Sequence, residues 1–436
     1  MTAAGPRRET HRPCAIGVDI GTSGVRALCM DAGFGVVATA HVSFAQLNAD
    51  RRDPAGWWLA TRRVLRELLS TVPAPAVTAL AIDGTSGTMI PVDRAGAPLA
   101  SARLYNDRCE DGRILDDIVA HAPRGSAAHG ATSGLAKLIQ FSSTPGARFV
   151  LHEADWIASR LSGLVGVSDE NNALKTGYDP VARAWPDWIA VTSANTDLLP
   201  DVKAPGEPVG CVSREIAAEF GLAETTVVVA GSTDGCASFL ATGADAVGDG
   251  VTALGTTLTI KMLSAAPIFA PEYGIYSHRL GDRWLAGGAS NTGGNVLSHF
   301  FTSADIACLS EDIDPDEPTG LGYYPLLRPG ERFPISDPDL PPRLAPRPES
   351  DAVYLQGLLE GIAEVEQLAY RRLAELGGPP LASVRSVGGG AGNPAWTRIR
   401  ERLLGVPFLE SASTEAAAGA ARLALKGAAT AGLAVA

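Results

Sequence analysis

The sequence of 436 residues lacks the features that mark secreted or membrane-spanning proteins. Its 6 cysteines are scattered without C-x-x-C spacing, which argues against a disulfide framework or a metal site and predicts reduced thiols in a cytoplasmic protein. No apolar run approaches the roughly 18 residues that a membrane span needs. Met1 to Pro13 has arginines but no apolar segment, so it does not resemble a secretory signal.

Positive charge is also scarce. Lys and Arg number 36 against 48 Asp and Glu, a net charge of −12, which argues against nucleic-acid or anionic-membrane partners and favours a small ligand. The chain contains no G-x-x-x-x-G-K-[ST], H-R-D or D-F-G sequence, so it is neither a P-loop enzyme nor a protein kinase. A G-x-G-x-x-A match begins at Gly33, but strand-like residues follow it, so it fails as a dinucleotide motif.

What the chain does contain predicts two well-packed α/β domains. Hydrophobic residues make up 46% of the sequence and charged residues 19%, and the length exceeds what one core usually serves. The pattern of strand, Gly-Thr-Thr turn and strand at residues 251–260 repeats that of residues 16–28, which indicates two domains of one fold. We expect them to comprise residues 13–240 and 241–436. Helical spacing is expected at residues 57–70, 149–161 and 353–376.

A turn rich in glycine and hydroxyl groups follows the first apolar run. Asp19 lies near the end of that run, and Gly21, Thr22, Ser23 and Gly24 complete the turn. The glycines allow close approach of a ligand, the hydroxyls and amides can bind phosphate, and Asp19 can hold a cation. An ordinary hairpin turn is the alternative, because the same residue types dominate turns.

Polar residues also follow later predicted strands. Ser86 lies in such a turn after the strand at residues 77–82, at the strand end where open α/β sheets bind ligands. Asp234 follows the strand at residues 227–231, where it could accept a proton from a bound hydroxyl or simply cap a helix. The run Asn106, Asp107 and Arg108 could fix ligand hydroxyls or cap a helix.

Consecutive glycines stand after the predicted strand at residues 384–387. Gly388, Gly389 and Gly390 would let a flat group such as an adenine ring lie against the backbone, with Asn393 close behind. A simple turn is the alternative.

In their order and spacing, these segments resemble the FGGY family of carbohydrate kinases, within the actin-like superfamily, from about residue 14 to residue 427. The resemblance is carried by residues 19–26, 106–108, 155–163, 231–235, 255–257, 330–334, 358–362 and 388–396. Residues 83–88, 105–108 and 171–179 look most like the short D-ribulokinase branch, also described as xylulose-kinase-like. Typical xylulokinases instead carry Gln-Met-His-Gly in place of Thr85 to Thr88 and a Trp in place of Tyr105.

The resemblance implies an α/β fold of two actin-like (ribonuclease H-like) domains with a nucleotide cleft between them. It also implies ATP- and Mg²⁺-dependent phosphorylation of a pentulose, most directly D-ribulose to D-ribulose 5-phosphate, by a cytoplasmic monomer or homodimer without nucleic-acid or membrane partners. The alternatives are a xylulokinase or a ribitol or polyol kinase of the same family. An actin-like ATPase or a non-catalytic sugar sensor would belong to a different class.

The resemblance also implies roles for individual residues. Asp234 would be the catalytic base and, with Asp19, would organise Mg²⁺. The nucleotide would contact Thr22, Ser23, Gly255, Thr256, Thr257, Gly389, Gly390 and Asn393. The sugar would contact Asp19, Ser86, Asn106, Asp107, Arg108 and Asp234.

Overall fold

The computed structural model describes residues 12–433, so the N-terminal segment considered above lies outside it up to residue 11. The described chain divides into two compact units. The first unit is formed by the described residues up to Pro123, by Ala127–Ala241 and by those from Glu415 onward. The second unit is formed by Arg124–Ser126 and Thr242–Thr414.

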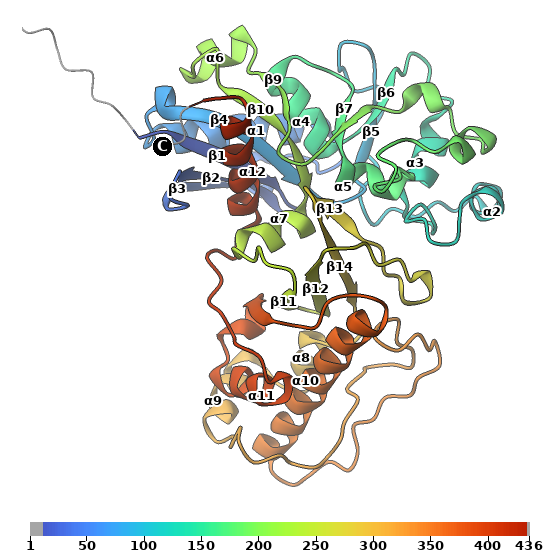
Figure 1. Ribbon diagram of the computed structural model, residues 1–436, viewed down its shortest axis with the longest axis vertical. Coiled ribbons are helices and arrows are strands. Elements are labelled where there is room, and N and C mark those ends of the chain that lie inside the picture. Colours follow the sequence, from blue (N-terminus) through green and yellow to red (C-terminus); the bar gives the residue numbers. More distant parts are fainter. Residues whose placement is uncertain (1–11, 434–436) are drawn as a thin grey trace, which may run out of the picture. The chain divides into compact units, whose positions relative to one another are not determined.

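The two units divide beside the expected boundary near residue 240, but the residues from Glu415 onward, which we expected in the second domain, belong to the first unit. Helix α12 (Ala416–Thr430) packs on the first unit, beside β1 and β4 (Figure 1). A Cβ atom at Gly17 would lie 1.9 Å from the carbonyl oxygen of Ala417, so only glycine permits this contact. Helix α12 is rich in alanine and glycine and therefore approaches the sheet closely. This contact joins segments far apart in the sequence, so dividing the chain at one position does not show it.

A mixed sheet of six strands forms the centre of the first unit, in the order β3-β2-β1-β4-β10-β9. Strand β1 pairs antiparallel with β2 and parallel with β4, and β10 pairs parallel with β4. The strands of this unit are β1 (Cys14–Ile20), β2 (Gly24–Asp31), β3 (Val36–Ser43), β4 (Val77–Gly84), β5 (Met89–Val92), β6 (Phe149–His152), β7 (Val167–Asp169), β8 (Asp201–Lys203), β9 (Pro208–Cys211) and β10 (Val227–Thr233).

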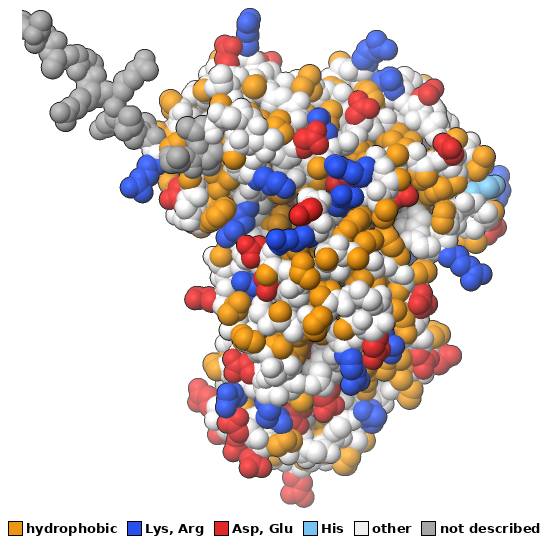
Figure 2. Space-filling view, in the orientation of Figure 1, with side chains coloured by type: hydrophobic (Ala, Val, Ile, Leu, Met, Phe, Trp, Pro, Cys, Tyr) orange, Lys and Arg blue, Asp and Glu red, His pale blue; other side chains and the backbone are white. Residues whose placement is uncertain are grey.

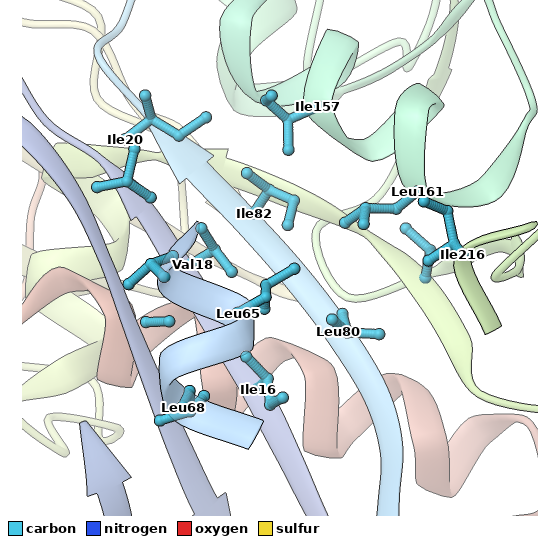
Figure 3. Packing of buried hydrophobic residues seen from close by; sticks show 14 of the residues in the cluster. Ile16, Val18, Ile20, Leu65, Leu68, Leu80, Ile82, Ile157, Leu161 and Ile216 are labelled. Atoms are coloured by element: carbon cyan, nitrogen blue, oxygen red, sulfur yellow. The ribbon is translucent and has the colours of Figure 1, made fainter. Parts of the chain in front are cut away.

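Helices cover both faces of this sheet, with α12 on one face and α1 and α4 on the other. The helices are α1 (Pro54–Leu69), α2 (Gly112–His121), α3 (Gly134–Phe141), α4 (Glu153–Ser162), α5 (Glu170–Ala173), α6 (Arg214–Phe220), α7 (Asp234–Ala241) and α12. Alternate apolar residues of β1 and β4 pack against α1, α4 and α6. Figure 3 shows this core, which includes Ile16, Val18, Ile20, Leu65, Leu68, Leu80, Ile82, Ile157, Leu161 and Ile216.

The second unit repeats the same strand pairing. Its sheet has the order β13-β14-β12-β11-β15, in which β11 pairs antiparallel with β12 and parallel with β15. The strands are β11 (Asp249–Leu254), β12 (Leu258–Ser264), β13 (His278–Leu280), β14 (Arg283–Ala289) and β15 (Ser383–Val387), and the helices are α8 (Gly294–Phe300), α9 (Ser303–Glu311), α10 (Asp351–Glu375) and α11 (Pro394–Leu404). The repeat predicted from the sequence is thus confirmed, and both units are actin-like.

Local periodicity located the long helices but misassigned one segment. The expected helices at residues 57–70 and 353–376 correspond to α1 and α10. The expected helix at residues 149–161 is wrong at its start, because Phe149–His152 forms β6 and pairs with β5. Its partner strand lies about 60 residues earlier in the chain, which is beyond the reach of a local pattern.

The surface agrees with the charge balance of the sequence. On the face shown in Figure 2, basic and acidic side chains are interspersed. Within residues 12–433, no helix is both long enough and apolar enough to cross a membrane.

Candidate active site

Three aspartates of the first unit lie where three adjacent parallel strands end. Asp19 in β1 pairs in register with Asp83 in β4, and Asp83 pairs with Ser232 in β10. Asp234 then begins α7, directly after β10. Because the carboxyl ends of parallel strands meet at one edge of a sheet, the fold brings these three carboxyl groups together.

The environment of this edge is strongly acidic. Burial raises the pKa of Asp19 to about 6, and repulsion from Asp234 adds to the shift, while the Arg26 guanidinium 3.6 Å away opposes it. Asp83 is completely buried, and burial followed by repulsion from Asp19 and Asp234 raises its pKa well above the usual value. Such a concentration of carboxyl groups favours a proton or a cation at this position.

Several buried polar atoms near these strand ends have no hydrogen-bond partner within the described chain. They are the hydroxyl of Ser86, the side-chain oxygen of Asn171 and both carboxyl oxygens of Asp83, whose carboxyl group does interact electrostatically with that of Asp19. The Asn171 amide nitrogen donates to the Ser232 hydroxyl at 3.0 Å, which ties it to the end of β10. Buried polar atoms in native proteins are nearly always hydrogen-bonded, so this group indicates a polar ligand.

A buried ion pair supports the turn that carries Ser86. Glu153, the first residue of α4, accepts hydrogen bonds from the Thr85 amide at 2.6 Å and the Thr85 hydroxyl at 2.5 Å. Its other oxygen pairs with Arg51 at 2.6 Å. Burial raises the pKa of Glu153 to about 7, against the opposing effect of Arg51. Glu153 and Arg51, which are distant from Ser86 in the sequence, therefore hold the Ser86 turn in place.

The position of Asp234 differs from that of a plain helix cap. The Thr233 hydroxyl accepts the Cys236 amide at 3.4 Å, which is the capping interaction of α7. The Asp234 carboxylate accepts the adjacent Gly235 amide at 2.6 Å and is partly exposed. Capping by Thr233 therefore accounts for the start of the helix without Asp234.

The expected sugar contacts in the Asn106 segment differ in their surroundings. Both oxygens of Asp107 bind Arg52, at 2.5 and 2.7 Å, and this partner holds the pKa of Asp107 below its usual value. Arg52 therefore fixes the orientation of the Asp107 carboxylate, which keeps acceptor positions for a further donor. Asn106 and Arg108 are exposed, and neither side chain forms a hydrogen bond or ion pair with another residue in 12–433.

Each unit has one hydroxyl-rich turn between its first two strands. Thr22 and Ser23 are exposed at the tip of the β1–β2 hairpin, which the Gly21 amide closes by donating to the Gly24 carbonyl at 2.9 Å. In the second unit, Gly255, Thr256 and Thr257 connect β11 to β12, and the Thr256 side chain is exposed. The start of α8 supports this turn, since the amides of Gly294 and Asn295 donate to the carbonyls of Gly255 and Thr256 at 2.8 and 3.0 Å.

The glycine run forms the short turn η7 (Gly389–Gly392) between β15 and α11. A Cβ atom at Gly390 would lie 2.4 Å from the Trp396 ring, whereas none of the described atoms lies within 4 Å of a Cβ at Gly389. Asn393 caps α11 by accepting the Trp396 amide at 3.0 Å and also donates to the Ser310 hydroxyl at 2.8 Å. Of these expected adenine contacts, Gly389 therefore offers the open surface.

The sequence interpretation missed Asp83, Glu153 and Asn171 as site components. Asp83 lies near the end of β4 as Asp19 lies near the end of β1, so an alignment of the two strand ends could have identified it. Glu153 and Asn171 act through Thr85 and Ser232, which lie 68 and 61 residues away, and no local pattern shows those contacts.

Two actin-like units, with carboxyl groups at the strand ends of the first, are the architecture of a sugar kinase or of an actin-like ATPase. The chain belongs to the FGGY family of carbohydrate kinases. The N-terminal domain of that family matches residues 14–114, and the C-terminal domain matches residues 250–428. The protein is therefore a carbohydrate kinase, which excludes the ATPase alternative as its main class.

Individual relatives agree with this assignment. The chain is 27% identical to the xylulose kinase of Escherichia coli (strain K12) over 443 residues, covering 94% of this chain and 89% of that one. It is 26% identical to the autoinducer-2 kinase of Yersinia enterocolitica over 450 residues, covering 92% and 83%. Among solved structures, a "xyloylose kinase" from Brucella ovis superposes with a TM-score of 0.84 at 25% identity, covering 96% of this chain and 91% of that one.

Proposed function

We propose that this carbohydrate kinase transfers the γ-phosphoryl group of ATP to a pentulose, converting D-ribulose to D-ribulose 5-phosphate. The observation that carries the proposal is the set of buried acceptor atoms around Asp83, Ser86 and Asn171, beside Asp19 and Asp234. Sugar hydroxyls are donors that satisfy such acceptors. An anionic sugar acid would be repelled by the clustered carboxyl groups, so a neutral polyol is the favoured class of substrate.

In this reaction Asp234 accepts the proton of the attacking hydroxyl. Its carboxylate is partly exposed at the start of α7, where Thr233 already satisfies the helix end. The hydroxyl oxygen then bonds to the γ-phosphorus as the bond to the β-phosphate oxygen breaks. Catalysis of this kind depends chiefly on positioning and on neutralising the phosphate charge.

We assign Mg²⁺ to Asp19 and Asp234, with nucleotide phosphates and water as its other ligands. No group of three or more His, Cys, Asp and Glu side chains among residues 12–433 has the spacing of a complete metal site. Mg²⁺ commonly keeps several waters and binds one or two carboxylates together with substrate phosphates. Asp19 and Asp234 would supply those carboxylates, and the ion would offset the phosphate charge.

The remaining contacts follow from the family resemblance. Thr22, Ser23, Gly255, Thr256 and Thr257 would contact the ATP phosphates, and Gly389, Gly390 and Asn393 would lie near the adenine. Ser86, Asn106, Asp107 and Arg108 would bind sugar hydroxyls, with Arg52 holding the Asp107 carboxylate in place.

D-xylulose is the second candidate acceptor, because two of the proteins that this chain resembles carry the name xylulose kinase or its variant. The turn Thr85 to Thr88 favours D-ribulose, because its residues differ from the Gln-Met-His-Gly of typical xylulokinases. Thr85 and Thr88 contact each other through their hydroxyls at 2.6 Å, so their side chains shape the turn beside Ser86.

A coupled ADP-release assay with D-ribulose, L-ribulose, D-xylulose, ribitol and glycerol tests the substrate, with D-gluconate as the anionic comparison. We expect the highest kcat/KM with D-ribulose and no turnover of gluconate. A higher kcat/KM with D-xylulose would replace the assigned substrate. ADP release that no sugar stimulates would contradict the proposed reaction.

A further inference from the structure

Lys137 is a buried cation of the first unit to which the proposed reaction assigns no role. It lies on α3 and is 1% exposed. Its ammonium donates to three backbone carbonyls, those of Gly87 at 2.7 Å, Thr132 at 3.2 Å and Tyr105 at 3.3 Å. An ammonium has three donors, so these acceptors use its full capacity.

Two of the three carbonyls belong to the segments assigned to the sugar. Gly87 directly follows Ser86, and Tyr105 directly precedes Asn106. One side chain of α3 thus contacts both segments at the residue next to a proposed sugar contact.

Thr88 provides a second link between the same segments. Its hydroxyl accepts the Tyr105 amide at 3.0 Å and contacts the Thr85 hydroxyl at 2.6 Å. The amide and the carbonyl of Tyr105 are therefore both held to the Ser86 turn. A β-bridge between Met89 and Arg103 aligns the flanking chain, but it lies two or more residues away from Ser86 and Asn106.

Placing an ammonium here has a free-energy cost that an apolar side chain would avoid. Burial lowers the pKa of Lys137 to about 8, Asp107 opposes this shift, and Lys175 and Arg103 add to it. His152, which also lies near Lys137, is buried and has its pKa lowered to about 3 by burial and by the two lysines, so it is neutral. No carboxylate in the described chain forms an ion pair with Lys137, so its contacts are those with the carbonyls.

We infer that Lys137 is a positioning residue for the sugar substrate, because its ammonium sets the spacing between the Ser86 turn and the Asn106 segment. The inference depends on the proposed sugar site. Under this inference, loss of Lys137 weakens binding of the sugar but not of the nucleotide. A residue that merely stabilised the fold would affect both substrates.

The test compares Lys137→Met with wild type in the full chain, with the exposed Lys426→Met as the surface control. Steady-state kinetics with the best acceptor of the screen would give separate KM values for sugar and ATP. We expect the sugar KM to rise about tenfold or more, because charge-assisted hydrogen bonds are lost, and the ATP KM to stay within twofold. Equal increases in both KM values, or an unchanged sugar KM, would overturn the inference.

Thr88→Val serves as the second variant if Lys137→Met does not fold. It removes the other link to Tyr105, so its sugar KM should also rise selectively, and an unchanged value would overturn the inference. Amide hydrogen exchange provides a readout that requires no turnover. In either variant we expect faster amide exchange than in wild type at residues 85–88 and 104–108, with unchanged exchange rates in the second unit.

These measurements separate two kinds of failure. If wild type phosphorylates none of the sugars, the proposed substrate class fails, whereas the exchange data still decide whether Lys137 holds the two segments together. Unchanged exchange at both segments would overturn the inference in that case. Turnover by wild type with an unaltered sugar KM in the variant would overturn the role of Lys137 alone.

Discussion

Asp19 and Asp83 pair in register on adjacent parallel strands, and burial raises the pKa of both carboxyl groups. Among residues 12–433, the basic neighbour of this pair is the partly exposed Arg26, whose guanidinium lies 3.6 Å from Asp19. Two buried acids with so little compensation destabilise the fold when both are charged. Their presence is consistent with a site shaped for its ligands at the expense of stability.

Asp19→Asn should therefore stabilise the protein while lowering its activity. The folded pKa of about 6 exceeds the usual 3.8, so the folded state binds more protons between these values and loses stability as the pH rises through this range. Above pH 6 the cost is constant, about 3 kcal/mol for a shift of this size, and the variant lacks it. Urea unfolding from pH 4 to 8 would measure this. The free energy of unfolding of Asp19→Asn should increase relative to that of wild type as the pH rises to about 6.

The exposed Asp282→Asn is the matched control and should follow the wild-type curve. If the free energies of unfolding of Asp19→Asn and wild type differed by the same amount at every pH, Asp19 would titrate normally. The kcat/KM of wild type should rise with pH through an apparent pKa near 6, if ionised Asp19 is needed for Mg²⁺.

Asp234→Asn should remove sugar-dependent ADP release and leave nucleotide binding intact. General-base catalysis typically contributes about 10²- to 10⁴-fold to the rate, so kcat should fall by about 100-fold or more. The amide retains the shape of the carboxylate, and Thr233 still caps α7. Calorimetric titration with a nonhydrolysable ATP analogue would check binding, and turnover near the wild-type rate would remove Asp234 from the role of base.

The sequence located those parts of the site that depend on neighbouring residues. The hairpin after Asp19 and the junction of strand and helix at Asp234 are local features, and both appear in the structure. Contacts between distant segments were not predictable. The ion pair between Arg52 and Asp107 joins residues 55 positions apart, so no local pattern shows that the expected sugar contact at Asp107 is held by an arginine.

The sequence also did not predict contacts that depend on small residues. Gly17 reads as an ordinary strand residue, yet it lies against the backbone of Ala417 and makes room for α12 on the first unit. Periodicity describes which face of a helix is apolar, but not which sheet that face covers.

The buried pair of Arg51 and Glu153 offers a test of how the Ser86 turn is held. Arg51→Met should lower the free energy of unfolding by about 3 kcal/mol or more, because it leaves the Glu153 carboxyl buried without its cation. Adding Glu153→Gln should recover part of that loss, since the remaining group is neutral. Urea unfolding of both single variants and the double variant at pH 8 would measure the coupling. Losses that simply add would show that the two side chains do not depend on each other.

Gly389→Ala tests the nucleotide side of the proposal without disturbing the fold. A Cβ atom there meets none of the described atoms within 4 Å, so the melting temperature should be unchanged. If adenine lies against Gly389, the added methyl group occupies its place, and the ATP KM should rise severalfold while the sugar KM does not. Gly392→Ala in the same turn is equally open and is the matched control, expected to leave both constants unchanged. An ATP KM that responds equally to both substitutions, or to neither, would place the adenine elsewhere than on Gly389.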